Sequence, residues 1–384
     1  MKREQSMVGA AFLQRAGDLK GELVEFSQQP RYERAASAFL EACGHQLEEL
    51  GEHELILLWD CFVLEHTLAN GRTVVEQFVA ANPQLTEPER EMVLGWRDVV
   101  QGPFQVLRRD GPALLVRSLV DELTYRVRSN MGPGIFRRTP RGWFIIARLV
   151  AVGDEWMLSG PLSVLPAAER DFAYELAMDL AVRMPEAAFR NPAKLALAWE
   201  QQRTERDRFI RFFGDDVVVI AGENVQDRMD DFVAFCRAEI LGRPEPDGPG
   251  APAIPLDILE SETVGLIYDE TDGLGFYAEF GLVEQAFTDP GLLRRRRWRE
   301  QTRVYLHDDT VEPMVLRRLA ERDPQKASVV FRRLLKWPRF EWSRDGVEML
   351  RELKQDYYAQ PPWPRVSLVS DQLTARRRPP SGNR

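Results

Sequence analysis

The hydrophobic period of the chain changes from helical to two at Gly102-Pro103, and this change most constrains its fold. Before this point, apolar residues recur at spacings of three and four, as in amphipathic helices. After it come short strand-like runs, separated by turn sequences such as Asp110-Gly111. The expected strands are residues 104–107, 113–118, 123–129, 143–152 and 156–159. Five short strands at this spacing predict a small barrel or a strongly bent sheet.

Helical patterns return after the strands. Helices are expected at residues 167–184 and 191–213, and Asn191-Pro192 supplies the cap and first residue of the second. A short β-branched strand (217–221) and one more helix lead to residue 241. Residues 242–252 contain too much proline and glycine for regular structure, so this segment is expected to be an exposed linker and the clearest domain boundary.

The expected fold class is therefore α+β, with a succession of distinct regions along the chain. They are a helical N-terminal region (1–102), a small basic β-barrel-like unit (103–165), a mainly helical middle with one short strand (166–241), a linker (242–255), a linked C-terminal α+β domain (256–373) and a disordered tail (374–384). The tail is expected to be disordered because its composition cannot bury a core.

Charge is distributed unevenly along the chain. The formal net charge is -9, yet residues 103–150 hold nine arginines and only three acids. Because the rest of an acidic protein repels a polyanion, nucleic acid is expected to bind only locally, at this basic segment. Alternation along Tyr125-Arg126-Val127-Arg128 places Arg126 and Arg128 on one face, which we expect to point outward.

A basic loop is expected to extend this surface. Arg137, Arg138 and Arg141 precede Trp143, in a segment predicted to be a flexible tip that reaches a ligand. Arginines bind phosphates, and Trp143 or Phe136 would stack on a base. The alternative is a solvated arginine-rich sheet face without a ligand.

A second basic element is predicted near residue 295. On a helix spanning residues 292–306, Arg295, Arg299 and Arg303 share one face at i, i+4 spacing and would grip a phosphate backbone. The alternative is that these arginines pair with Glu300 and other acids.

Signals for enzymatic chemistry are weak. Asp215 and Asp216 precede a strand and are candidate ligands of a divalent metal, although turn and cap roles are typical of such residues. None of the four histidines lies in a nucleophile motif, and residues 271–275 lack the glycines and lysine of a phosphate loop. We therefore expect a binding protein without a catalytic site, a cofactor or a resident metal.

The expected location is the cytoplasm. Cys43, Cys61 and Cys236 are predicted to be small core residues in a reducing compartment. The first residues lack the apolar run of a secretion signal, and the apolar runs elsewhere are far shorter than the roughly 20 residues that a membrane span needs. No membrane partner is expected.

Several stretches resemble a known family. They are residues 62–78 (FVLEHTLANGRTVVEQF), the strand through Arg148-Leu149, Ser159-Gly160-Pro161, and Phe340-Glu341-Trp342 before Leu350. Together they resemble a largely uncharacterised bacterial family, some members of which end in a cysteine-rich zinc segment of the SEC-C type. The resemblance implies a shape and almost no activity. No cysteine follows Cys236, so the zinc segment is absent from this sequence.

These patterns predict a non-enzymatic protein that contacts nucleic acid through an arginine-rich β-face. One alternative is a protein-interaction module whose arginines meet an acidic partner or the chain's own acids. A weaker alternative is a metal-dependent hydrolase or nuclease that uses Asp215 or Asp216.

Overall fold

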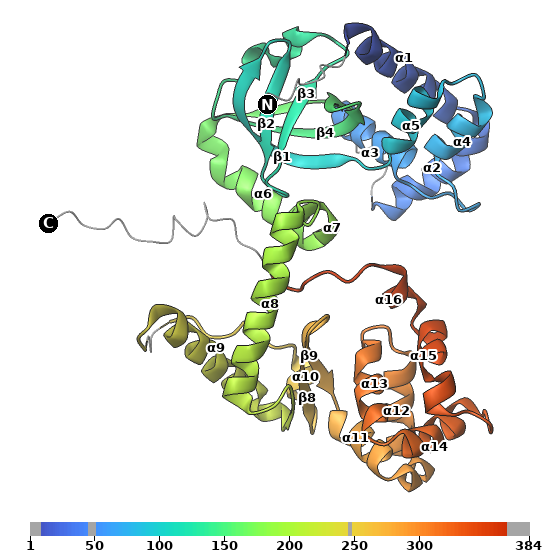
Figure 1. The fold of residues 1–384 in the computed structure, drawn as a ribbon, viewed down its shortest axis with the longest axis vertical. Helices are drawn as coiled ribbons and strands as arrows, with labels where there is room; N and C mark the ends of the chain where they lie inside the picture. Colours follow the sequence, from blue (N-terminus) through green and yellow to red (C-terminus); the bar gives the residue numbers. More distant parts are fainter. Residues whose placement is uncertain (1–8, 45–50, 245–247, 367–384) are drawn as a thin grey trace, which may run out of the picture. The chain divides into compact units, whose positions relative to one another are not determined.

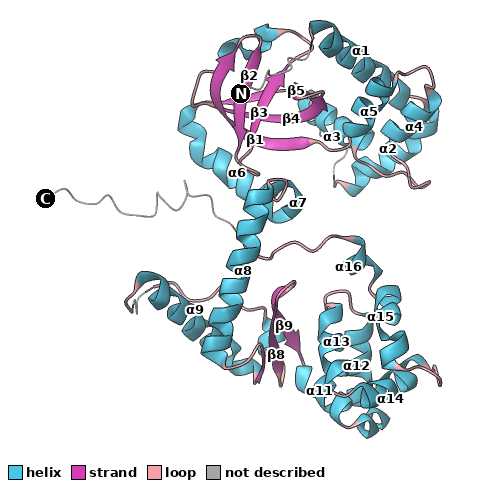
Figure 2. Ribbon diagram, in the orientation of Figure 1, coloured by secondary structure: helices cyan, strands magenta, loops and turns pink. Residues whose placement is uncertain are grey.

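The computed structural model describes residues 9–44, 51–244 and 248–366, which belong to two compact units (Figures 1 and 2). The first unit ends at Lys194 and the second begins at Leu195, inside helix α8 (Pro192–Phe213). Each unit has its own hydrophobic cores. The expected α+β class is confirmed.

The first unit begins with helices, as the apolar spacing predicts. They are α1 (Ala10–Ser27), α2 (Pro30–Ala42), α3 (Glu52–Leu64), α4 (Val74–Ala81) and α5 (Glu87–Gly95). The start of α5 is the expected capping box, because the Glu89 carboxylate accepts hydrogen bonds from both the backbone N–H and the hydroxyl of Thr86, each at 2.8 Å. Buried residues such as Leu19, Phe62 and Trp96 join these helices in one core.

The expected five strands form a closed barrel. They are β1 (Val100–Asp110), β2 (Ala113–Ser118), β3 (Thr124–Arg128), β4 (Phe144–Val152) and β5 (Glu155–Leu158). Their order is β1-β2-β3-β5-β4, and pairing of β4 with β1 closes the barrel. All pairs are antiparallel except β3 with β5. This order, with its single parallel pair, is the connectivity of an OB-fold barrel.

A short 3₁₀ helix, η2 (Pro133–Arg138), connects β3 to β4 and closes the barrel interior. Its Phe136 is 1 % exposed and packs in the barrel core with residues such as Phe104 and Tyr125. The prediction that Phe136 stacks on a base is therefore wrong, because the ring faces the core. Period-two patterning does not extend into η2, so the sequence pattern alone did not place this ring.

Other elements cover the outside of the barrel. Val150, Val152 and Met157 project from β4 and β5 into the core of the N-terminal helices. Helix α6 (Arg170–Arg183) packs on the barrel, where the ring centroids of Tyr174 and Phe144 lie 6.4 Å apart. The remaining elements of this unit are β6 (Ser163–Leu165), η3 (Ala167–Glu169) and α7 (Pro185–Ala188).

The second unit is built on an antiparallel sheet of β7 (Val217–Ile220), β8 (Val264–Asp269) and β9 (Gly273–Ala278). Alternate residues of β8 face two cores. Leu266 packs with Phe209 of α8 and Phe232 of α9 (Val225–Leu241), whereas Ile267 packs with the helices that follow β9.

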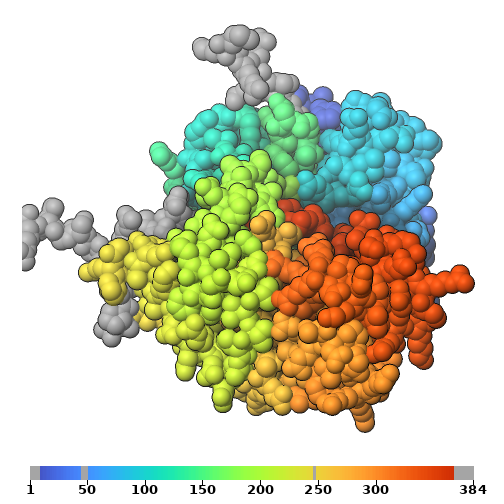
Figure 3. All heavy atoms as spheres, turned by 60° about the horizontal axis from the view of Figure 1, so that its bottom comes forward, coloured from blue at the N-terminus to red at the C-terminus, as the bar shows by residue number. Residues whose placement is uncertain are grey.

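Those following helices form a bundle that appears as one continuous body, coloured orange to red, in Figure 3. They are α11 (Phe280–Thr288), α12 (Arg296–His307), α13 (Pro313–Arg322), α14 (Pro324–Leu335) and α15 (Trp342–Leu353). Shorter elements are η4 (Gly222–Asn224), α10 (Leu256–Leu259), η5 (Pro290–Arg294) and α16 (Gln355–Ala359).

The proline-rich segment differs from the expected domain boundary. Strands β7 and β8 flank it in the sequence and pair with each other, so it lies within the second unit. Ala251 and Ile254 pack against the core of that unit, and their backbone N–H groups donate to Asp230 and Gln226. Proline and glycine thus predicted the loss of regular structure in this part of the chain, but they do not prevent Ala251 and Ile254 from packing. The predicted tail (374–384) lies outside the described residues.

Two further predictions concern membrane-spanning segments and cysteines. Searching the described ranges finds no helix with the length and apolar character that a membrane crossing requires. Cys43 is exposed, and Cys61 and Cys236 are partly buried, so the prediction of a core position is wrong for Cys43. Cys43 follows the last residue of α2, where the apolar face of that helix ends.

Candidate nucleic-acid interface

The arginines of β3 lie on the outer face of the barrel, but both bind an acid. Arg126 donates to Glu155 at 2.8 Å and also binds Asp110, and Arg128 donates to the second carboxylate oxygen of Glu155 at 3.1 Å. Arg128 is only 8 % exposed, so the expected outward position describes its strand face but not its accessibility. Parallel pairing of β5 with β3 brings Glu155 to this place.

Two neighbouring strand arginines are also paired, whereas Arg109 of β1 is exposed and has no ion pair with a described residue. Arg108 binds Asp110 at 3.0 Å, and Arg117 binds Glu122 at 3.1 Å. Most of the positive charge on the strand face is thus paired with the chain's own acids, as one of the alternatives from the sequence expected. Glu155 is the residue that sequence reasoning missed, because no local pattern shows that β5 lies beside β3.

The arginines of the β3–β4 connection are arranged differently. Arg137, Arg138 and Arg141, which we call the basic loop, are exposed and form no ion pair with any residue in the described ranges. Arg137 and Arg138 end η2, directly after the buried Phe136. Three positive charges without described partners therefore lie within five residues of chain.

The barrel anchors both ends of the basic loop. Phe136 is fixed in the core, and its carbonyl accepts the Thr139 hydroxyl at 2.7 Å. On the other side, Gly142 N–H donates to the Val106 carbonyl at 2.9 Å, and Val106 N–H donates to the Trp143 carbonyl at 2.8 Å. Trp143 itself is partly exposed. The loop is therefore short and anchored, with its arginines directed away from the core.

The second predicted basic element forms only in part. Helix α12 begins at Arg296, after the 3₁₀ turn of η5, so Arg295 precedes the helix instead of sharing a face with Arg299 and Arg303. The guanidinium of Arg295 lies over the Trp298 ring, 5.4 Å from its centroid. Within the part of the chain that the structure describes, Arg299 and Arg303 have no ion pair.

Other arginines of the 294–299 run match the alternative expectation. Arg296 binds Glu300 at 2.7 Å, and Arg297 binds Glu262 at 2.8 Å. The α12 arginines belong to the second unit and the basic loop belongs to the first.

The two acids considered as metal ligands have other partners in the structure. Asp216 binds Arg206 and Arg318, and Arg318 also binds Asp269 at 2.9 Å. Burial raises the pKa of Asp216, but the hydrogen bonds and charges of Arg318 and Arg206 outweigh burial and lower it overall. The two carboxylates thus converge on a guanidinium. Asp215 caps the start of β7 by accepting the N–H of Asp216 at 2.6 Å.

No group of three or more metal-ligating side chains occurs within the described ranges. Asp215 thus has a capping role of the kind that the sequence favoured, whereas Asp216 forms ion pairs that the sequence did not predict.

A buried ionic network is the other polar feature that the sequence did not indicate. Asp60 of α3 accepts hydrogen bonds from Lys20 at 2.6 Å, Arg148 at 2.7 Å and the Ser159 hydroxyl at 2.8 Å. Burial alone raises the pKa of Asp60, but the charges of Lys20 and Arg148 outweigh it and hold the pKa below its usual range. The network joins the helices to the barrel, so we assign it a structural role.

Comparisons with known proteins give no relative: no protein-family model, no curated protein and no solved structure matches this chain.

Proposed function

We propose that this protein binds nucleic acid through the basic loop of its barrel. The observation that carries the proposal is that Arg137, Arg138 and Arg141 are exposed together and lack acidic partners in the described chain. Most strand arginines have such partners, namely Arg108, Arg117, Arg126 and Arg128. A guanidinium without a partner binds a phosphate without first breaking an ion pair. The overall charge of -9 repels polyanions elsewhere, which restricts binding to such a local surface.

Trp143 supports single-stranded nucleic acid as the preferred form. Its ring is partly exposed and lies two residues from Arg141. Unpaired bases stack on aromatic rings, at about 1 to 3 kcal/mol per base, while arginines hold the neighbouring phosphates. The proposed contact residues are therefore the basic loop and Trp143.

The barrel topology supports the proposal by analogy at the level of fold. OB-fold barrels bind oligonucleotides on the face of their second and third strands and on the adjoining loops. In this chain the β1–β2 and β4–β5 turns are very short. On the strand face, arginines such as Arg126 form ion pairs with acids of the chain. We therefore place the contact on the β3–β4 connection. Arg299 and Arg303 of α12, beside Arg295, are a proposed second contact.

The test is binding of labelled single- and double-stranded DNA and RNA to the full chain and to Arg137→Glu/Arg138→Glu/Arg141→Glu. The matched control is Arg34→Glu/Arg72→Glu/Arg183→Glu, which changes the net charge equally at exposed positions of the same unit. The proposal predicts loss of binding in the loop variant only.

Equal loss in both variants would attribute binding to total charge and not to the basic loop. A folded wild-type chain that binds no nucleic acid at low salt would refute the proposal, and an acidic protein partner would then be the leading explanation for the unpaired arginines.

A further inference from the structure

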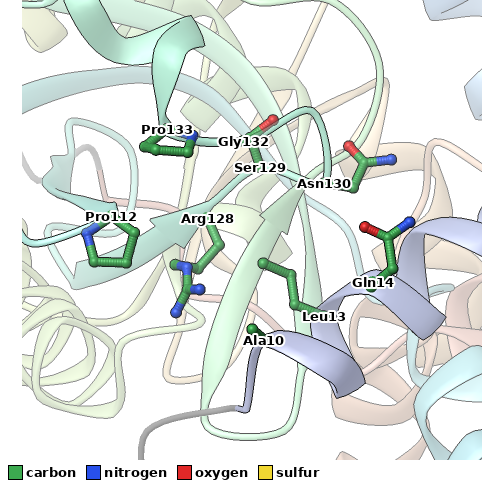
Figure 4. Close-up of a pocket in the computed structure, with 9 residues that line it drawn as sticks. All are labelled: Ala10, Leu13, Gln14, Pro112, Arg128, Ser129, Asn130, Gly132 and Pro133. Carbon is green, nitrogen blue, oxygen red and sulfur yellow. The ribbon is translucent and has the colours of Figure 1, made fainter.

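A pocket of about 170 Å³ lies beside the barrel, between the first turns of α1 and the chain that leaves β3. Figure 4 shows the residues that line it, among them Leu13, Gln14, Pro112, Arg128, Asn130 and Pro133. The guanidinium of Arg128 lies between Pro112 and Leu13, and the side-chain amides of Gln14 and Asn130 lie together on another side. The pocket thus combines one cation, two amides and several apolar surfaces.

Arg128 has unused hydrogen-bonding capacity in this pocket. It is 8 % exposed, and Nη1 donates to Glu155 at 3.1 Å. No other described residue accepts a hydrogen bond from this guanidinium, although arginine carries five N–H donors. None of these donors is sealed from solvent, since Arg128 is not among the described residues with a buried, unpaired polar atom. An oxyanion in the pocket can therefore accept charged hydrogen bonds from them in place of water.

The charge balance also favours an anion. Glu155 is shared between Arg126 and Arg128, and Arg126 has Asp110 as a further partner. Arg128 is therefore the member of this cluster without an acid of its own. An oxyanion in the pocket would supply the missing negative charge. A guanidinium binds carboxylate and phosphate oxygens in the same forked geometry.

We propose that this pocket binds a small organic anion, whose carboxylate or phosphate contacts Arg128 and whose short apolar part packs against Leu13 and Pro133. The size fits such a ligand, because a protein cavity of about 150 Å³ accommodates a benzene ring. This site is separate from the basic loop, since none of the three loop arginines lines the pocket. The anion-binding proposal is therefore tested independently of nucleic-acid binding, and failure of one does not refute the other.

The experiment measures binding of benzoate, phenyl phosphate and uncharged benzyl alcohol to the full chain by saturation-transfer NMR and calorimetry. We expect benzoate or phenyl phosphate to bind and benzyl alcohol to bind much more weakly, and the tighter of the two anions identifies the head group. Arg128→Gln is expected to weaken anion binding tenfold or more, since it removes a charged hydrogen bond.

Arg126→Gln is the matched control, because Arg126 lies on the same strand face and binds the same glutamate but does not line the pocket. Its anion affinity is expected to stay within about twofold of wild type, as for a residue without ligand contact. Ala10→Phe provides a test that keeps every charge, since Ala10 lines the pocket and a phenyl ring there fills it. It is expected to abolish anion binding.

Three results would overturn the proposal: equal weakening by the two arginine variants, unchanged binding in Ala10→Phe, or no anion binding by the folded wild-type chain.

Discussion

An arginine that already holds a carboxylate and one that holds none respond differently to a phosphate. Arg126 would have to release Glu155 and Asp110 to bind one, whereas Arg138 has no described partner to release. Composition counts both as a positive charge, so the sequence predicted one basic surface where the structure has a neutralised face and an unpaired loop. Accessibility and pairing decide which arginines are available.

The same residue-scale reasoning applies to Asp60, which is 6 % exposed between Lys20 and Arg148. Asp60→Asn leaves the two cations without their shared partner. We expect it to lower the free energy of unfolding by about 3 to 5 kcal/mol, measured by urea denaturation. Asp179→Asn removes an exposed ion pair with Arg183 and serves as the control, with an expected loss of about 0.5 kcal/mol or less.

The Asp60 contribution depends on pH. Because the folded-state pKa of this carboxyl is lowered, its stabilisation is complete above the unfolded-state pKa of about 3.9 and is lost as the pH falls through the folded-state value. The stability gap between wild type and Asp60→Asn should therefore be largest near neutral pH and shrink below about pH 4. A gap that is constant or grows on acidification would contradict this assignment.

At the scale of elements, η2 closes the barrel and presents the basic loop. Phe136→Ala removes a ring that is 1 % exposed, and we expect it to destabilise the first unit by about 3 to 5 kcal/mol. Trp337→Ala is a control with a large aromatic side chain that is 45 % exposed, and its effect should be much smaller. Thermal unfolding followed by circular dichroism measures both, and equal effects would show that Phe136 does not close the core.

Elements that depend on local pattern were predicted well. The five barrel strands follow from alternation and turn residues, and α5 follows from Thr86 and Glu89. The position of Glu155 beside Arg126 depends on the parallel pairing of β3 with β5, which joins segments far apart in the chain. Long-range pairing of this kind leaves no periodic signal, which explains why the counter-ions of the predicted site were missed. Arg137, Arg138 and Arg141 were predicted to form a flexible loop tip. In the structure Arg137 and Arg138 end the 3₁₀ helix η2, and the connection is anchored at both ends.

At the scale of the whole molecule, the chain has two compact units with separate cores. Their boundary falls within α8, a continuous 22-residue helix without a change of composition, so the sequence pointed instead to the proline-rich segment. Helix α8 supplies Phe209, Phe212 and Phe213 to a core of the second unit. Helical periodicity does not report where along a continuous helix one compact unit ends and the next begins.

Separate cores predict separate unfolding transitions. In calorimetry of the full chain, Phe136→Ala should lower one transition by roughly 10 °C and leave the other unchanged. Phe331→Ala, in the core of the second unit, should do the reverse. A single transition that both variants shift equally would mean that the two units unfold as one.

The central claim is that phosphates contact the basic loop and not the strand face, and the salt dependence of nucleic-acid affinity tests it most directly. The slope of log affinity against log salt changes by about 0.7 for each contact with a single strand. Neutralising the loop with Arg137→Gln/Arg138→Gln/Arg141→Gln should therefore make the slope shallower by about two, whereas Arg117→Gln/Arg126→Gln should leave it nearly unchanged. A slope that becomes shallower in the strand-face variant and stays constant in the loop variant would contradict the account.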